Sequence, residues 1–189
     1  MNLMDIFKKP TSVNITGRTS TITNAFVNSI IPGIDPMEEQ LRECLEILEL
    51  DPEDLRCAYC GDKSTEWDHL RQIVEKKKPT GYISDIYNLV PSCGKCNQSK
   101  GNKYWKDWII SDAKLSPKNL KVPDINQRIG RLEKYEKWKQ VKKIDFENIV
   151  GTKLWAQHWN NCEKLHDMMR EFQDLASQIK DKIQAHVGD

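Results

Sequence analysis

The sequence lacks any long hydrophobic run, and no stretch approaches the roughly 18 to 20 apolar residues that a membrane span requires. Asp5 and two lysines interrupt the opening MNLMDIFKKP, where a secretory signal peptide needs an apolar segment. Internal repeats and low-complexity linkers are also missing from the sequence. These absences favour a cytoplasmic protein that has no membrane partner and folds as one cooperative unit.

An excess of one charge is missing as well, because 29 basic and 28 acidic residues give the 189-residue chain a net charge of +1. The two signs are nevertheless separated along the sequence. Residues 36–54 carry eight acidic residues and one basic residue, whereas residues 71–106 carry eight basic and two acidic residues. A charge run is usually a solvated face, but a basic patch of this kind also attracts a phosphate backbone. Both interpretations remain open from charge alone.

Cysteine is the informative residue type. Four of the six cysteines form two identical spacings, Cys57-x-x-Cys60 and Cys93-x-x-Cys96, with 32 residues between them. Disulfides require an oxidising compartment, and a thioredoxin-type site needs one such motif rather than two. Tetrahedral Zn²⁺ accepts four thiolates at about 2.3 Å. The two pairs therefore predict a structural zinc site.

Hydrophobic periodicity predicts helices on both sides of the cysteine segment. The expected helices span residues 21–31, 36–50, 104–110, 124–143 and 153–187. The remaining cysteines, Cys44 and Cys162, fall on apolar positions of two of these helices and are expected to be small buried residues. Trp105 and Trp108 are expected to pack in the core rather than to stack on bases.

Two strands and a short helix are predicted around the second cysteine pair. Residues 66–70 and 86–90 have strand character and are joined by a basic loop that suits a hairpin, and a helix of about two turns follows. Zinc would hold this helix near the first pair, so that Asp68, His69 and Asn97 converge. Histidine, with a pKa of about 6.5, is the natural base at neutral pH, and Asp and Asn oxygens suit Mg²⁺ or Mn²⁺. Lys100 is expected to point to the same side as Asn97 and to hold a phosphate.

The order Cys-x-x-Cys, Trp-Asp-His, Asn-Leu and Cys-x-x-Cys-Asn-x-x-Lys resembles the zinc-supported HNH (ββα-metal) endonuclease family over about residues 57–103. The resemblance implies that His69 is the general base and that Asp68 is the first metal ligand. Asn88 matches the residue that braces the loop bearing the base. Asn97 stands where the family has a second metal ligand, which is His in many members.

The resemblance also implies an α+β fold. A ββα-metal core with the four-cysteine zinc site would occupy residues 55–110, with an N-terminal helical extension over residues 1–54 and a C-terminal helical region over residues 111–189. Implied cofactors are structural Zn²⁺ and catalytic Mg²⁺ or Mn²⁺, and the implied partner is double-stranded DNA.

Several functions remain open on this evidence. Analogy favours a DNA endonuclease of restriction or anti-phage defence, and the alternatives are a homing or nicking endonuclease and the nuclease subunit of a multi-protein defence complex. An alternative of another class is a non-catalytic zinc module that binds nucleic acid. That module would explain the cysteines and lysines, but it would need neither Asp68 and His69 nor Asn97.

The last predicted helix carries an apolar seam with alternating spacings of three and four residues. Its members are Cys162, Leu165, Met169, Phe172, Ala176, Ile179 and Ile183. The seam packs on the protein's own helices, or it joins a second subunit or a partner helix; the sequence leaves both open. His158, His166 and His186 lie on the same helix and are expected to be solvated.

Overall fold

A computed structural model describes residues 6–8 and 10–187 of the chain. The chain divides into two compact units. The larger unit contains residues 27–149, and the smaller unit combines the described residues before position 27 with those from position 150 onward. The mixture of helices with small sheets confirms the predicted α+β class.

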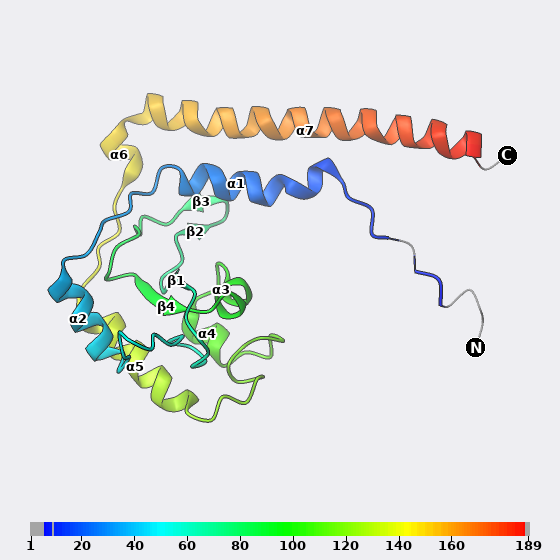
Figure 1. Ribbon diagram of the computed structural model, residues 1–189. Coiled ribbons are helices and arrows are strands. Elements are labelled where there is room, and N and C mark those ends of the chain that lie inside the picture. The colour runs from blue at the N-terminus through cyan, green and yellow to red at the C-terminus, as the bar shows by residue number, and fades with distance from the viewer. Residues whose placement is uncertain (1–5, 9, 188–189) are drawn as a thin grey trace. The chain divides into compact units, whose positions relative to one another are not determined.

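Two short antiparallel strands and one helix form the centre of the larger unit (Figure 1). Strand β1 (Glu66–His69) pairs with β4 (Leu89–Ser92), with Asp68 opposite Val90 and His69 opposite Leu89. Helix α3 (Gly94–Lys100) follows β4 almost directly. The predicted order of strand, strand and helix is therefore present.

The second strand begins three residues later than predicted, because the chain first makes a turn at Asp85. The Tyr87 amide donates to Asp85 Oδ1 at 3.1 Å, and the Asn88 amide donates to the Asp85 carbonyl at 3.0 Å. Aspartate commonly closes turns in this way by accepting from the backbone two residues on. Residues 86–90 thus include part of a turn as well as the start of the strand.

A small hairpin carries part of the basic segment. Strand β2 (Val74–Glu75) pairs with β3 (Lys78–Pro79), and Lys76 and Lys77 form the two-residue turn with φ values of 49° and 64°. Turns with two positive φ values normally favour Asn and Gly. Here two exposed lysines occupy both positions, so the hairpin presents their ammonium groups at its tip.

The remaining helices of the larger unit cover this centre. They are α2 (Glu38–Ile47), α4 (Trp105–Ile109) and α5 (Ile125–Trp138), and α6 (Phe146–Val150) follows where the two units meet in the sequence. Trp105 and Trp108 are buried in the core, as predicted. From α5, the Tyr135 hydroxyl lies within hydrogen-bond distance of the Ile86 and Leu89 carbonyls, so α5 holds the chain where it enters β4.

The smaller unit consists of helical segments. A 3₁₀ turn, η2 (Ile15–Arg18), leads into α1 (Thr19–Asn28), and the long α7 spans Thr152–Val187 (Figure 1). The Ile15 amide donates to Gln173 Oε1 at 2.7 Å, and this contact ties η2 to α7. None of the helices in the described residues is both long enough and apolar enough to span a membrane.

The structure corrects the prediction that His158 and His166 are solvated. His166 is 4 % exposed, and its Nε2 lies 3.3 Å from Thr23 Oγ1. His158 is half-buried, and its Nε2 lies 3.0 Å from the Phe26 carbonyl. Both histidines fall on the face of α7 that packs inside the smaller unit, where polar neighbours satisfy their ring nitrogens. His186 is exposed, as predicted.

Candidate functional site: a four-cysteine centre beside an Asp-His strand

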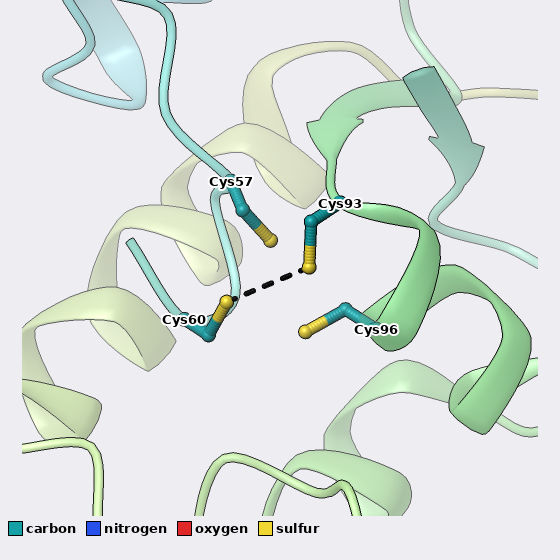
Figure 2. Close-up of side chains that lie close together, drawn as sticks. All are labelled: Cys57, Cys60, Cys93 and Cys96. Carbon is teal, nitrogen blue, oxygen red and sulfur yellow. Dashed lines mark hydrogen bonds between the residues drawn. The ribbon is translucent and has the colours of Figure 1, made fainter. Parts of the chain in front are cut away.

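The four predicted zinc ligands converge (Figure 2). Cys57 and Cys60 come from the turn before β1, and Cys93 and Cys96 come from the junction of β4 and α3. Their sulfur atoms all lie within 4.8 Å of one another, and the Cys60 and Cys93 sulfurs are 3.7 Å apart. Tetrahedral Zn²⁺ with bonds of about 2.3 Å separates its sulfur ligands by about 3.8 Å. The donor set and its spacing therefore fit one zinc ion.

The four thiols also influence one another's protonation. Hydrogen bonds from Cys60 and Cys96 lower the pKa of Cys57 well below its usual range. The hydrogen bond with Cys57 is the largest factor raising the pKa of Cys60, which reaches about 12, and it also raises the pKa of Cys96. One thiolate is thus stabilised by thiols that keep their protons. Several thiolates can coexist in this space only with a cation among them, which Zn²⁺ supplies.

Backbone contacts fix the first cysteine turn against the sheet. The Ala58 amide donates to the Pro91 carbonyl of β4 at 2.8 Å, and the Cys57 amide donates to the Asp62 carbonyl at 2.7 Å. Gly61 closes the turn with a φ of 82°, which glycine adopts without steric cost. The turn therefore occupies a defined place beside β4 through its own hydrogen bonds.

Alternation along β1 separates its side chains onto two faces. Glu66 and Asp68 contact α3, whereas Trp67 and His69 lie on the other face. Asp68 is 4 % exposed and accepts a hydrogen bond from the Tyr59 hydroxyl at 2.7 Å. Lys100 Nζ lies 3.2 Å from the same oxygen of Asp68. Burial raises the pKa of Asp68, and Lys100 and Tyr59 oppose this by favouring the carboxylate.

Lys100 points to the same side of α3 as Asn97, since both contact the Glu66 and Asp68 face of β1, but its ammonium does not face solvent as a phosphate ligand would. Lys100 is only 1 % exposed, and its ammonium contacts Asp68 and the Gly101 carbonyl. Burial lowers the pKa of Lys100, and Asp68 opposes that shift. Because α3 packs this side chain inward, the ammonium neutralises Asp68 instead of facing solvent.

Asn97 is half-buried, and its amide donates to Glu66 Oε2 at 3.0 Å. The contact joins α3 to the Asp68 face of β1. Glu66 was not singled out from the sequence. Its position two residues before Asp68, on the same face of a strand, is the signal that would have identified it.

His69 is the last residue of β1 and is half-buried. Its Nε2 lies 2.7 Å from Ser84 Oγ. Ser84 is itself fixed, because its amide donates to the Pro32 carbonyl and its carbonyl accepts from the Ile34 amide. Burial, followed by the positive charge of Lys100, lowers the pKa of His69 to about 4. The imidazole is therefore neutral at pH 7 and able to accept a proton.

Asn88 is fully buried behind the chain that leaves β1. Its Oδ1 accepts from the Arg71 amide at 2.8 Å, and its Nδ2 donates to the Arg71 and Ile83 carbonyls at 3.1 and 3.2 Å. The Leu70 amide donates to the Asn88 carbonyl at 2.8 Å. One side chain thus holds both the segment after His69 and the segment before Ser84.

The His69 face of β1 borders an apolar cavity of about 410 Å³. Trp67, Ser84 and Leu89 line it, together with residues 33–36 and Leu41. Ser84 belongs both to this lining and to the His69 contact. The His69 face therefore adjoins open space, whereas on the other face Tyr59 and Lys100 pack against Asp68.

Sequence reasoning missed Tyr59 and Ser84. Tyr59 lies inside the first cysteine pair, where its residue type alone does not distinguish a carboxylate partner from a core aromatic. Ser84 lies 15 residues from His69, in a loop. The only sequence signal for this contact is a hydroxyl within the segment that joins the two strands.

Comparison with known proteins gives one match. A family model described as HNH endonuclease matches residues 57–103. The matched segment covers about a quarter of the chain and contains both cysteine pairs, the Asp-His pair of β1, and α3. Among curated proteins and among solved structures, nothing matches.

We predict that the purified, folded protein carries one tightly held zinc ion per chain, to be measured by elemental analysis. Cys57→Ser and Cys96→Ser should lose the ion and give loosened or insoluble protein, because zinc binding in such sites is coupled to folding. Cys162→Ala is the matched control, because this cysteine is buried outside the cluster. Folded, soluble wild-type protein without zinc would contradict the assignment.

Proposed function

We propose that the protein hydrolyses phosphodiester bonds in double-stranded DNA with His69 as the general base, because residues 57–103 match the HNH endonuclease family model. The observation that supports this most directly is the pair of adjacent residues at the end of β1. Asp68 is a buried carboxylate beside the zinc-binding turns, and His69 is a neutral histidine held at Nε2 by Ser84.

His69 would remove a proton from a water whose oxygen attacks the phosphorus in line, while the bond from phosphorus to the leaving 3′ oxygen breaks. In the tautomer that has its hydrogen on Nε2, this nitrogen donates to Ser84 Oγ, and Nδ1 is unprotonated and available to the water. At pH 7 the imidazole is neutral, which is the form that a general base requires. Ser84 keeps the ring in one orientation.

Asp68 and Asn97 are the residues proposed to hold Mg²⁺ or Mn²⁺, since both offer the hard oxygen ligands that these ions prefer. When bound, such an ion neutralises the charge that develops on the phosphate and on the leaving oxygen. Asn88 supports the site from behind by fixing the turn after His69, in agreement with the bracing role implied by the resemblance.

The proposed DNA contact is the hairpin tip formed by Lys76, Lys77 and Lys78. All three lysines are exposed, and the turn holds two of them in the left-handed region. Phosphate contacts position a protein on DNA without reading sequence. The hairpin would therefore supply affinity rather than specificity.

A non-catalytic zinc module that binds nucleic acid is the contrasting interpretation. It is less well supported because a binding module does not need a buried Asp68 beside a histidine that is oriented by Ser84. Incubation of plasmid DNA with the protein and Mg²⁺ or Mn²⁺ separates the two functions in one gel, because only the nuclease converts supercoiled plasmid to nicked or linear forms.

We propose a cytoplasmic role in restriction or anti-phage defence, by analogy with HNH enzymes of similar size. The alternatives are a homing or nicking endonuclease and the nuclease subunit of a multi-protein defence complex. Gene context discriminates between them: a neighbouring methyltransferase favours restriction, and a neighbouring ATPase favours a defence complex.

The apolar seam of α7 is the basis for a proposed homodimer. In its first half, Cys162 and Met169 are buried within the smaller unit. In its second half, Phe172, Ile179 and Ile183 are more than half exposed. One site with one catalytic ion cuts one strand, so two copies related by a two-fold axis are the simplest source of a double-strand break.

We expect His69→Ala to lower the cleavage rate by a factor of about 10² to 10⁴, the usual cost of removing a general base. Zinc content and DNA affinity should stay near wild type. Asp68→Ala and Asn97→Ala should also lose activity, in part restored by excess Mn²⁺. His186→Ala is the control, because this exposed histidine lies on α7. Cleavage by His69→Ala at the wild-type rate would refute the mechanism.

We expect Lys76→Asn combined with Lys77→Gly to weaken binding to all DNA sequences alike. This pair removes two charges while supplying residues that the turn prefers. The slope of log affinity against log salt should fall by about 0.9 per lost phosphate contact. The double variant Lys114→Gln with Lys134→Gln, at exposed lysines outside the basic segment, should keep the wild-type slope. An unchanged slope in the hairpin variant would exclude this contact.

We expect light scattering after size-exclusion chromatography to give twice the 22.0 kDa chain mass. Phe172→Asp should return the monomer mass, because it places a charge in the exposed half of the seam. Leu154→Asp is the control, since this exposed leucine lies near the other end of α7. A wild-type mass near 22.0 kDa at micromolar concentration, with and without DNA, would reject the homodimer.

A further inference from the structure

We infer that Tyr59 and Lys100 are positioning residues: they bind one oxygen of Asp68 and thereby present its other oxygen to the catalytic metal ion. Through these two residues, the four-cysteine centre would set the affinity of Asp68 for the catalytic metal ion. This inference rests on the proposed function, because it concerns how Asp68 holds that ion.

The first observation is that both partners end on the same atom. The Tyr59 hydroxyl donates to Asp68 Oδ2 at 2.7 Å, and Lys100 Nζ lies 3.2 Å from Oδ2. Within the described residues, Asp68 Oδ1 accepts no side-chain hydrogen bond and is not among the fully buried polar atoms that lack a partner. Oδ1 is therefore the oxygen that keeps access to a ligand from outside the core.

The second observation is that Tyr59 and Lys100 have little freedom to act elsewhere. Tyr59 is fully buried, and its ring packs edge-on against Trp108 with a centroid distance of 5.2 Å. Lys100 is 1 % exposed, and a buried ammonium that left its carboxylate would be an uncompensated charge in the core, which is strongly unfavourable. Both side chains are thus fixed on Asp68.

The third observation is where the two residues are attached. Tyr59 lies between the zinc ligands Cys57 and Cys60, and Lys100 lies four residues after Cys96 on α3. Zinc would hold both turns in place, so the position of each Asp68 partner follows from the cysteine centre. The structural ion and the catalytic ion are then linked through one carboxylate.

Hydrogen bonds to the second oxygen of a ligating carboxylate orient the first, and loss of such an outer partner typically weakens metal affinity by 10- to 100-fold. Tyr59→Phe is the most conservative test, because it removes a single hydroxyl and changes no charge. Tyr104→Phe is the matched control, since it also removes a tyrosine hydroxyl that contacts a carboxylate, Glu136 Oε2 at 3.3 Å.

The measurement is Mn²⁺ binding to the zinc-loaded full chain without DNA, by titration calorimetry, with Asp68→Ala defining the background from other sites. Tyr59→Phe should raise the Mn²⁺ dissociation constant about tenfold at unchanged zinc content, and Tyr104→Phe should leave it unchanged. In cleavage assays the Mn²⁺ concentration for half-maximal rate should rise by the same factor, while the rate at saturating Mn²⁺ returns to wild type.

Lys100→Met gives an independent test of direction. If Lys100 were only a charge that competes with the ion, its removal would strengthen Mn²⁺ binding; a positioning role requires weaker binding, with recovery in Lys100→Arg. Stronger binding by Lys100→Met, or unchanged affinity in zinc-loaded Tyr59→Phe, would overturn the inference. If Tyr59→Phe loses zinc, the comparison of Lys100→Met with Lys100→Arg decides whether the inference holds.

The same titration separates this inference from the proposed function. A chain that binds Mn²⁺ through Asp68 and shows the Tyr59→Phe shift, but does not cleave DNA, would retain the inference and lose the nuclease proposal. A wild-type chain that binds Mn²⁺ no better than Asp68→Ala would overturn the inference.

Discussion

The convergence of four thiols on one small volume is the constraint on which the rest of the larger unit depends. Helix α3 has seven residues, and β1 and β4 have four each, so none of these elements is long enough to be stable alone. The cysteine centre joins the turn before β1 to the junction of β4 and α3. Metal binding at such centres is folding free energy. Zinc would therefore stabilise an arrangement of two strands and a helix that are too short to be stable through local propensity alone.

Once those turns are fixed, charge can be buried next to them. Asp68 and Lys100 form an ion pair that is almost inaccessible to solvent, and Tyr59 adds a hydrogen bond. A buried pair of this kind gains little net stability over apolar packing, because desolvation opposes the Coulomb attraction. The ion pair instead fixes geometry, because it holds the Asp68 carboxylate in one orientation, whereas a solvated carboxylate could adopt several orientations.

The sequence was sufficient for the features that depend on spacing. The two cysteine pairs predicted one four-thiol centre, and alternation with turn residues predicted the order of strand, strand and helix. The features that depend on tertiary packing were not predictable. The inward direction of Lys100 depends on which side of α3 meets β1. The contact between Ser84 and His69 depends on a loop held by residues 32–34, and His166 is buried because it lies four residues after Cys162 on the packed face of α7.

The place where β1 ends determines whether side chains from its two faces can reach the same phosphate group. Asp68 and His69 are neighbours in a strand, so their side chains leave on opposite faces and diverge along its length. A single phosphate can meet both only at the end of the strand, where the pleat stops. Asn88 defines that end, because its side chain holds the backbone at Arg71 while its carbonyl accepts from Leu70. On the proposed mechanism, a buried asparagine that touches neither reacting group would thus help to fix where the base and the metal ligand act.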